Sequence, residues 1–235
     1  PWGALSGVRP SKLSTKALLA GKTRRQAERE LEREFFVTPE RAKLCVDASE
    51  HTVEAMNLLA PRDLSVYIGI PFCPTRCAYC SFVSESVERF GEFLPPYLDC
   101  LLREVEYTGK LLRQSGWHVR TLYMGGGTPT TLSAEQMARL LEAVNTHFDL
   151  SRCLEFTVEG GRPDTLDAEK LRVIKAGGAT RISINPQTMS DTVLKAVGRR
   201  HSAASVVDVF HQARKAGFDD INMDLIAGLP ADTAD

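Results

Sequence analysis

Three cysteines stand close together in the sequence, with three residues between Cys73 and Cys77 and two between Cys77 and Cys80. Thiolates are the usual protein ligands of iron–sulfur clusters and are also common ligands of zinc. A 4Fe–4S cluster has four irons, so three thiolates would leave one iron open to a ligand that is not protein. The alternative is a structural zinc site. Zinc in such sites usually has four protein ligands, and the loop offers no His or fourth Cys.

The other three cysteines, Cys45, Cys100 and Cys153, are scattered through apolar sequence that is helical or strand-like in pattern. A disulfide framework would tie distant loops together, which the tight spacing of the first three cysteines does not suggest. We therefore expect the scattered cysteines to be buried thiols, because a free Cys packs as a small hydrophobic residue. This usage favours a reducing, cytoplasmic compartment.

Two further segments carry groups that could contact a small molecule. The run from Met124 to Pro129 contains three successive glycines, and without Cβ atoms their backbone can approach a ligand closely; a tight structural turn is the alternative. Glu159, followed by Gly160-Gly161-Arg162-Pro163-Asp164, could accept hydrogen bonds from an ammonium group or from ribose hydroxyls, or could simply cap a helix. Asp224 lies in an apolar run, where a buried carboxylate would need a partner.

These residues follow short apolar runs that read as buried parallel strands, because the runs are rich in Val, Ile, Phe and Tyr. Five such runs are predicted: 65–70, 121–124, 154–158, 181–184 and 221–226. Helical patterns lie between them, with start signals at Ser133, Asp167 and Ser190, and a further helix over 203–216. Alternating strands and helices predict an α/β fold with a parallel sheet, a partial (βα) barrel of the TIM-barrel type whose C-terminal part is missing.

A separate helical region is predicted to precede this sheet. Residues 23–34 are charged and amphipathic, and Thr38-Pro39 is typical of a helix start, with that helix running toward Leu59 before Pro61. We therefore expect two parts, a helical N-terminal region over residues 1–62 and an α/β core over residues 63–235.

The overall composition is that of a globular protein, with 43% hydrophobic and 25% charged residues. The formal net charge of −1 provides no overall field that would attract nucleic acid, so we expect no nucleic-acid partner. No run of roughly 18 apolar residues occurs, so we expect no membrane span. The N-terminus has neither an initiator Met nor the regions of a signal peptide, and we expect a piece of a longer, soluble protein.

The cysteine loop resembles the signature of the radical S-adenosylmethionine (SAM) superfamily, in which an aromatic residue, here Tyr79, precedes the third cysteine. The resemblance implies that Cys73, Cys77 and Cys80 hold a 4Fe–4S cluster and that the open iron binds the amino and carboxylate groups of SAM. It also implies an unidentified one-electron donor. Reductive cleavage of SAM would yield a 5′-deoxyadenosyl radical that abstracts hydrogen from the substrate, while the protein positions the cofactors and keeps water away.

Within that superfamily, the segments from Asp63 onward resemble the oxygen-independent coproporphyrinogen III oxidase (coproporphyrinogen dehydrogenase-like) family. The stretch from Trp2-Gly3 to Arg9-Pro10 and the run Glu159 to Asp164 look most like its clostridial and bacillar subgroup. The resemblance implies a tetrapyrrole substrate and contacts to SAM from six residues: Tyr67, Tyr79, Gly126, Gly127, Thr128 and Glu159. Gln187, Arg199 and Asp224 match positions that help to hold a second SAM in the oxidase, although Arg199 could also be a surface residue beside Arg200.

One position departs from the oxidase pattern. The oxidase carries a further Cys two residues after the third cluster cysteine, and here that residue is Phe82. Relatives that act as haem chaperones also lack that Cys. Three hypotheses therefore follow: oxidative decarboxylation of coproporphyrinogen III to protoporphyrinogen IX, a haem chaperone that keeps the cluster and SAM, and a radical SAM enzyme for an unrelated substrate. His201, which follows Arg199 and Arg200 in the chain, is expected to be structural or solvent-facing.

Overall fold

A computed structural model describes residues 1–5 and 9–233 and divides into two compact units, Pro1–Pro61 and Arg62–Asp235. The stretch from Trp2 to Pro10 that carries part of the family resemblance therefore lies partly outside the described residues.

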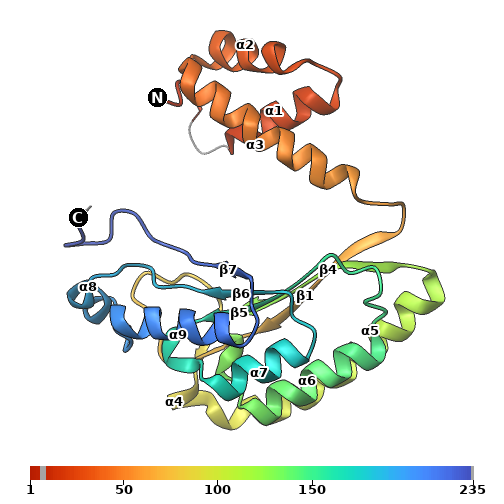
Figure 1. Ribbon diagram of the computed structural model, residues 1–235, viewed down its shortest axis with the longest axis vertical. Coiled ribbons are helices and arrows are strands. Elements are labelled where there is room, and N and C mark those ends of the chain that lie inside the picture. Colours follow the sequence, from red (N-terminus) through yellow and green to blue (C-terminus); the bar gives the residue numbers. More distant parts are fainter. Residues whose placement is uncertain (6–8, 234–235) are drawn as a thin grey trace. The chain divides into compact units, whose positions relative to one another are not determined.

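Three helices form the N-terminal unit: α1 (Pro10–Leu19), α2 (Arg24–Phe35) and α3 (Pro39–Asn57) (Figure 1). Helix α2 begins with a capping box in which Thr23 and Gln26 satisfy each other's backbone amides. Helix α3 begins at Pro39, as predicted, although the Thr38 side chain makes no capping bond to the helix. A small core that includes Leu31 and Val46 holds the three helices together.

The second unit is built on a five-stranded sheet in which every neighbouring pair is parallel, as predicted. Its strands lie in the order of the chain: β1 (Asp63–Ile70), β4 (His118–Gly126), β5 (Glu155–Gly161), β6 (Arg181–Ile184) and β7 (Asp220–Asn222). The carboxyl ends of all five strands therefore meet at one edge of the sheet, where chemistry is located in parallel α/β folds.

The last strand is shorter than predicted, because pairing ends at Asn222 rather than continuing to Ile226. Its neighbour β6 ends at Ile184, and Pro186 beyond it has no N–H for the ladder. Beyond that point only an isolated bridge joins Gln187 to Leu225. Asp224 is consequently an exposed residue after the strand and not a buried one within it.

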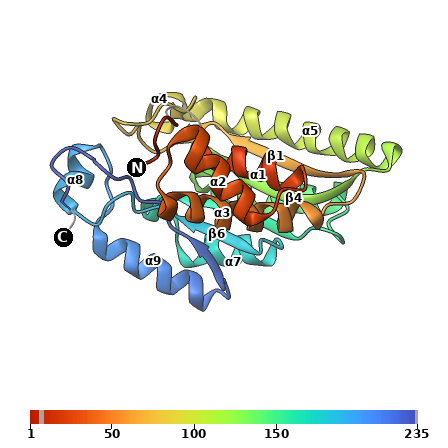
Figure 2. The same ribbon diagram turned by 90° about the horizontal axis from the view of Figure 1, so that it is seen from above.

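Helices α5 (Leu94–Ser115), α6 (Ala134–His147), α7 (Ala168–Ala176) and α9 (Ala203–Lys215) lie on the same face of the sheet (Figures 1 and 2). The unit also contains the shorter elements α4 (Val87–Phe90), α8 (Asp191–Ala196) and the small pair β2 (Phe72–Cys73) and β3 (Glu85–Ser86). Short 3₁₀ helices lie at Gly91–Phe93, Pro129–Thr131 and Pro163–Thr165. The predicted start signals are confirmed, since Ser133, Asp167 and Ser190 each accept a bond from a first-turn amide. Among the described residues, no helix is both long and apolar enough to cross a membrane.

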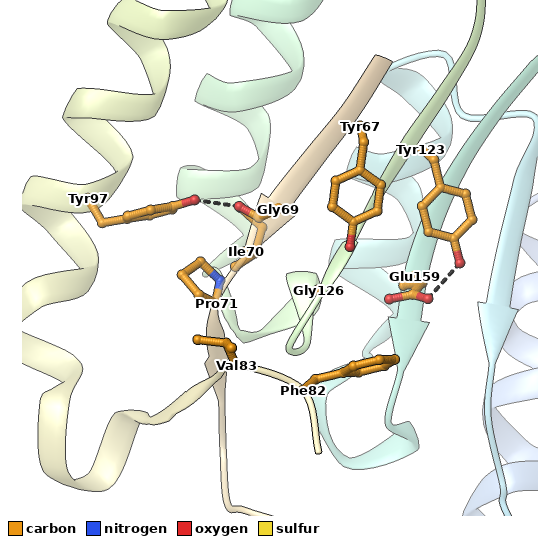
Figure 3. Close-up of a pocket in the computed structure, with 10 residues that line it drawn as sticks. All are labelled: Tyr67, Gly69, Ile70, Pro71, Phe82, Val83, Tyr97, Tyr123, Gly126 and Glu159. Carbon is orange, nitrogen blue, oxygen red and sulfur yellow. Dashed lines mark hydrogen bonds between the residues drawn. The ribbon is translucent and has the colours of Figure 1, made fainter. Parts of the chain in front are cut away.

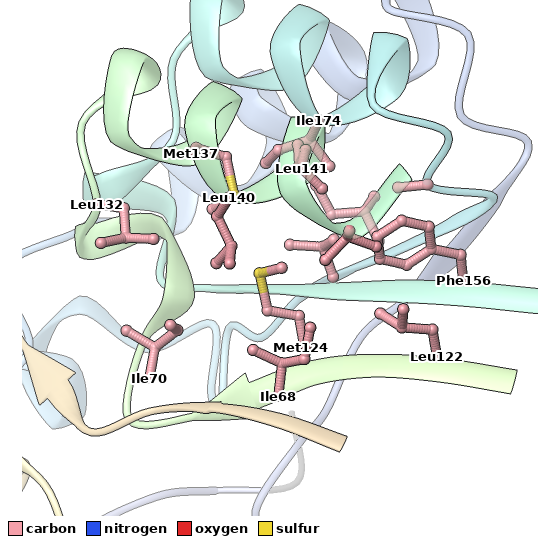
Figure 4. Packing of buried hydrophobic residues seen from close by; sticks show 14 of the residues in the cluster. Ile68, Ile70, Leu122, Met124, Leu132, Met137, Leu140, Leu141, Phe156 and Ile174 are labelled. Atoms are coloured by element: carbon pink, nitrogen blue, oxygen red, sulfur yellow. The ribbon is translucent and has the colours of Figure 1, made fainter. Parts of the chain in front are cut away.

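Alternation along the strands separates the two faces of the sheet. Met124, Phe156 and Ile182 are almost fully buried under the helices, and Figure 4 shows Met124 and Phe156 packed against side chains of α6. Residues of the opposite parity, such as Tyr123 and Glu159, point to the other face. The apolar face therefore packs against the helices, and the polar face presents side chains that could form a site.

Gly109 offers a test of how tightly α5 is packed. A Cβ at this position would lie 2.4 Å from the carbonyl oxygen of His147 at the end of α6. Mid-helix Gly→Ala normally stabilises a helix by about 1 kcal/mol, but here we expect Gly109→Ala to lower the free energy of unfolding by at least about 1 kcal/mol, because the clash is with backbone. Urea denaturation measures the change. Tyr107→Ala, at an exposed position of the same helix, should stay within about 0.5 kcal/mol of the parent; a stabilised Gly109→Ala would contradict the packing.

Candidate active site

The cysteine loop leaves β1 at the carboxyl edge of the sheet and is held by bonds from distant parts of the chain. The amide of Ala78 donates to the carbonyl of Val197 at 3.1 Å, and the Thr75 hydroxyl donates to the carbonyl of Gly198 at 3.2 Å. At its start, Cys73 belongs to β2, which pairs with β3. The loop is therefore fixed at its start and in its middle.

All three loop cysteines line one cavity of about 150 Å³. The same wall carries eight of the nine other predicted site residues: Tyr79, Gly126, Gly127, Thr128, Glu159, Gln187, Arg199 and Asp224. The Thr128 hydroxyl lies 3.4 Å from the Cys73 sulfur. Residues that follow separate strands thus meet around the three thiols, as the parallel topology requires.

The cavity lining holds the three cysteine thiols and the carboxylates of Glu159 and Asp224, with no histidine among its described residues. Within residues 1–5 and 9–233, no three His, Cys, Asp or Glu side chains are grouped as they would be around a single metal ion. Three closely spaced thiols without a fourth Cys or a His beside them fit an iron–sulfur cluster with one open iron better than a four-ligand structural zinc site.

Tyr67 does not line this cavity but lies in the adjacent one, which has a volume of about 530 Å³ (Figure 3). There its ring stacks on Tyr123 at a centroid distance of 5.9 Å. Gly126, Glu159 and Phe82 line both cavities, so the two spaces adjoin. Aromatic walls beside a thiol-lined space would shield reactive chemistry from water.

Glu159 is the carboxylate shared by the two cavities, and the Tyr123 hydroxyl donates to its Oε1 at 2.5 Å (Figure 3). Burial raises the pKa of Glu159, while hydrogen bonds from Tyr123 and from the Gly126 amide oppose that rise. Burial also raises the pKa of Tyr123, and its bond to Glu159 adds to the effect, so the phenol keeps its proton and remains a donor. Sequence reasoning did not single out Tyr123, although its alternation with Met124 before the glycine run places it on the polar face.

At each of the three successive glycines, a side chain would crowd other atoms of the protein, even with no ligand bound. A Cβ at Gly125 would lie 2.8 Å from a Glu159 carboxylate oxygen, and one at Gly127 would lie 2.7 Å from the Phe72 carbonyl oxygen. Gly126 has a φ of +113° and lies against the backbone of Ile70. Without side chains, Gly126 and Gly127 can pack directly against the start of the cysteine loop. The contact of these two glycines with SAM stays a prediction.

Arg199 is buried, with only 9% of its surface exposed, so the alternative of a surface residue is wrong. Its Nε donates to the Tyr79 hydroxyl at 3.1 Å and its Nη1 to the Asn185 carbonyl at 2.7 Å. Burial raises the pKa of Tyr79 to about 12, although the Arg199 charge opposes the shift, so this tyrosine also remains a phenol. Arg199 therefore connects the cysteine loop to the end of β6.

Asp224 and Gln187 meet through their backbones, since the Gln187 amide donates to the Asp224 carbonyl at 3.0 Å. Because Asp224 is exposed, it does not need the partner expected for a buried carboxylate, although the Asn222 side-chain amide donates to its carboxylate at 2.9 Å. Gln187 has a φ of +70°, an uncommon backbone conformation for a residue with a side chain. These two residues and Arg199 line the same cavity but come from different loops.

The remaining cysteines differ from one another. Cys45 is buried and Cys153 is half-buried, whereas Cys100 is exposed, and the prediction of a buried thiol is wrong there. The buried face of α5 carries Leu98 and Leu101, and position 100 falls on the other side of the helix. His201 is buried, which excludes the solvent-facing alternative.

Comparison with known proteins decides the family: residues 67–235 match the radical SAM superfamily. The chain belongs to this superfamily. Radical SAM proteins carry a 4Fe–4S cluster and SAM, and these are its cofactors. The structure is a partial radical SAM barrel. It superposes on the structure of coproporphyrinogen III oxidase (HemN) from Escherichia coli with a TM-score of 0.66 and 30% identity, over 78% of this chain and 42% of that one.

Two relatives in this superfamily have similar sequences. The oxygen-independent coproporphyrinogen-III oxidase-like protein HemZ of Bacillus subtilis is 40% identical over 98% of this chain and 47% of its own length. The heme chaperone HemW of the same organism is 39% identical over 72% of this chain and 44% of its own length. The chain thus spans less than half the length of these relatives, which belong to one HemN-type group with different named activities.

Proposed function

We propose that this chain is part of a radical SAM oxidoreductase that decarboxylates propionate side chains of coproporphyrinogen III to vinyl groups without oxygen. In the proposed assignment, residues 63–235 are the radical SAM core and residues 1–62 a helical N-terminal region. The observation that carries the proposal is the placement of Gln187, Arg199 and Asp224 in the cavity wall that also holds the three cysteines. These positions resemble those that hold a second SAM in the oxidase.

Cys73, Cys77 and Cys80 would hold the cluster and leave one iron for SAM. When bound, the cluster and SAM supply a 5′-deoxyadenosyl radical, which takes a hydrogen atom from a substrate C–H bond. The residues of the chain orient and shield this chemistry. Glu159 offers carboxylate oxygens to the ribose hydroxyls or amino group of SAM, and the Tyr67–Tyr123 stack provides an apolar wall.

The overall reaction converts a propionate into a vinyl group with loss of one hydrogen atom, CO₂ and one electron. An electron acceptor must therefore take up that last electron, and a separate one-electron donor must reduce the cluster. None of the six cysteines is joined in a disulfide, which suits a reducing, cytoplasmic setting, in which we place the protein.

A haem chaperone is the second candidate, and Phe82 favours it, because the further cysteine of the oxidase is missing at this position. Phe82 is 69% exposed and lines both cavities, so a ligand in either one would meet it. Under this alternative the same cluster and SAM would serve haem delivery and not decarboxylation.

Anaerobic reconstitution of the full-length protein with iron and sulfide, followed by SAM, a reductant and coproporphyrinogen III, separates the candidates. The oxidase proposal expects vinyl-containing product and 5′-deoxyadenosine in proportion. Stoichiometric haem binding without product would instead support the chaperone. SAM cleavage with neither porphyrin turnover nor haem binding would point to an unrelated substrate.

Asp224→Asn tests the second SAM. Asp224 is exposed and fixed by Asn222, so the substitution should leave the fold and the cluster intact. We expect SAM cleavage without porphyrinogen to persist and porphyrinogen turnover to fall by about tenfold, the cost of one hydrogen bond to a charged group. The exposed Asp219→Asn serves as the control. Full porphyrinogen turnover in Asp224→Asn would remove the second-SAM assignment for this residue.

A further inference from the structure

Arg162 is a buried cation beside the cysteine loop, with 2% of its surface exposed. Two of its N–H groups, on Nε and Nη2, donate to the two carboxylate oxygens of Asp164 at 3.1 and 3.0 Å. Its Nη1 donates to the Thr75 hydroxyl at 2.7 Å and to the Thr75 carbonyl at 3.2 Å. A guanidinium has five N–H donors, and four are used here. Arg162 lines the cavity, yet it has little capacity left to bind a ligand there.

The carboxylate of Asp164 compensates the charge of Arg162. Burial alone would raise the pKa of Asp164, but His201 and Arg162 outweigh burial and hold that pKa well below its usual range. The His201 side chain is fully buried, with Nδ1 3.8 Å from an Asp164 oxygen. A bidentate pair of this kind fixes the plane and the direction of the guanidinium.

The residue that Arg162 holds is Thr75, which lies midway between Cys73 and Cys77. The Thr75 hydroxyl also donates to the Gly198 carbonyl at 3.2 Å, so it is held from two sides. Both neighbouring cysteines depend on the backbone conformation at Thr75. The bond from Arg162 to the Thr75 carbonyl fixes one of its two peptide units directly.

We propose that Arg162, oriented by Asp164, is a positioning residue for the iron–sulfur cluster. It acts through Thr75 and fixes the spacing of the Cys73 and Cys77 thiolates. The inference rests on the proposed ligand role of the three cysteines. It gives a role to the Arg-Pro-Asp run that follows Glu159.

The test measures how fast the reconstituted full-length protein loses iron to a chelator, together with the electron paramagnetic resonance spectrum of its reduced cluster without SAM. Thr75→Val removes the hydroxyl at nearly constant shape, and Arg162→Lys removes the planar fork but keeps the charge. Each should speed iron loss by roughly tenfold, the factor for one charge-assisted hydrogen bond, and shift the spectrum. Thr75→Ser keeps the hydroxyl and should therefore show the rate of iron loss and the spectrum of the parent.

The double variant Thr75→Val/Arg162→Lys should lose iron more slowly than the product of the two single effects, because both changes remove the bond between Arg162 and the Thr75 hydroxyl. Arg181→Lys is the matched control, since Arg181 pairs with Glu155 and Asp220 on the same sheet. Parent rates of iron loss in both single variants, or effects that multiply in the double variant, would overturn the proposal. So would weaker SAM binding with unchanged iron loss, which would make Arg162 a ligand contact.

The two proposals fail in different ways. The cysteine assignment is wrong if the parent protein takes up no cluster. It is also wrong if variants without the loop cysteines hold as much cluster as the parent. If the parent holds its cluster and the variants of Thr75 and Arg162 lose iron at the parent rate, the cysteine assignment stands and the positioning role alone is lost.

Discussion

Replacing Cys73, Cys77 or Cys80 by Ala, one at a time, is expected to abolish the broad visible absorbance of the reconstituted cluster. The reason is that these three thiols line one cavity with no histidine among the described residues around it. Loss of any one thiolate would leave two for a cluster that needs three. Visible absorbance and iron and sulfide content after anaerobic reconstitution measure the effect.

The other three cysteines provide the controls. Cys100→Ala is the most informative, because this thiol is exposed and would react readily with added iron if binding were unspecific. Cys45→Ala and Cys153→Ala should likewise leave the absorbance unchanged. If all six variants behaved alike, the loop would not be the site of the cluster.

Glu159→Gln is expected to weaken SAM binding by up to about a hundredfold while the cluster remains. The substitution keeps the shape of the side chain but removes the negative charge that a SAM amino group or ribose hydroxyl would contact, a loss of about 1.5–3 kcal/mol. The Tyr123 hydroxyl, which donates to Glu159 in the parent, can still donate to the amide oxygen of the new side chain, so the local packing should persist. Equilibrium binding of SAM to the reconstituted protein gives the affinity.

Glu155→Gln is the matched control, since this carboxylate lies on the same strand β5 and forms an ion pair with Arg181. SAM affinity should remain at the parent level in that variant. Equal SAM affinity in Glu159→Gln and the parent would move Glu159 out of the SAM site, whatever its position in the cavity wall.

Much of this fold could be predicted because its signals are local. Ser133 and Asp167 cap the helices that follow them through bonds to amides in the first turn, so a few neighbouring residues decide where those helices begin. The run Arg181–Ile184 forms a strand with the predicted bounds. The end of β7 could not be predicted in this way, because it depends on where its neighbour β6 stops offering backbone partners.

The sequence by itself determined the three-cysteine loop and the alternating order of strands and helices, since spacing and periodicity are properties of neighbouring residues. Its similarity to known proteins determined membership of the radical SAM superfamily. Only the tertiary structure decided that Arg199 is buried against Tyr79, that Asp224 is exposed, and that Arg162 joins Asp164 to Thr75. Burial and pairing of charges depend on which distant segments the fold brings together. A buried cation requires a partner that its neighbours in the chain need not supply.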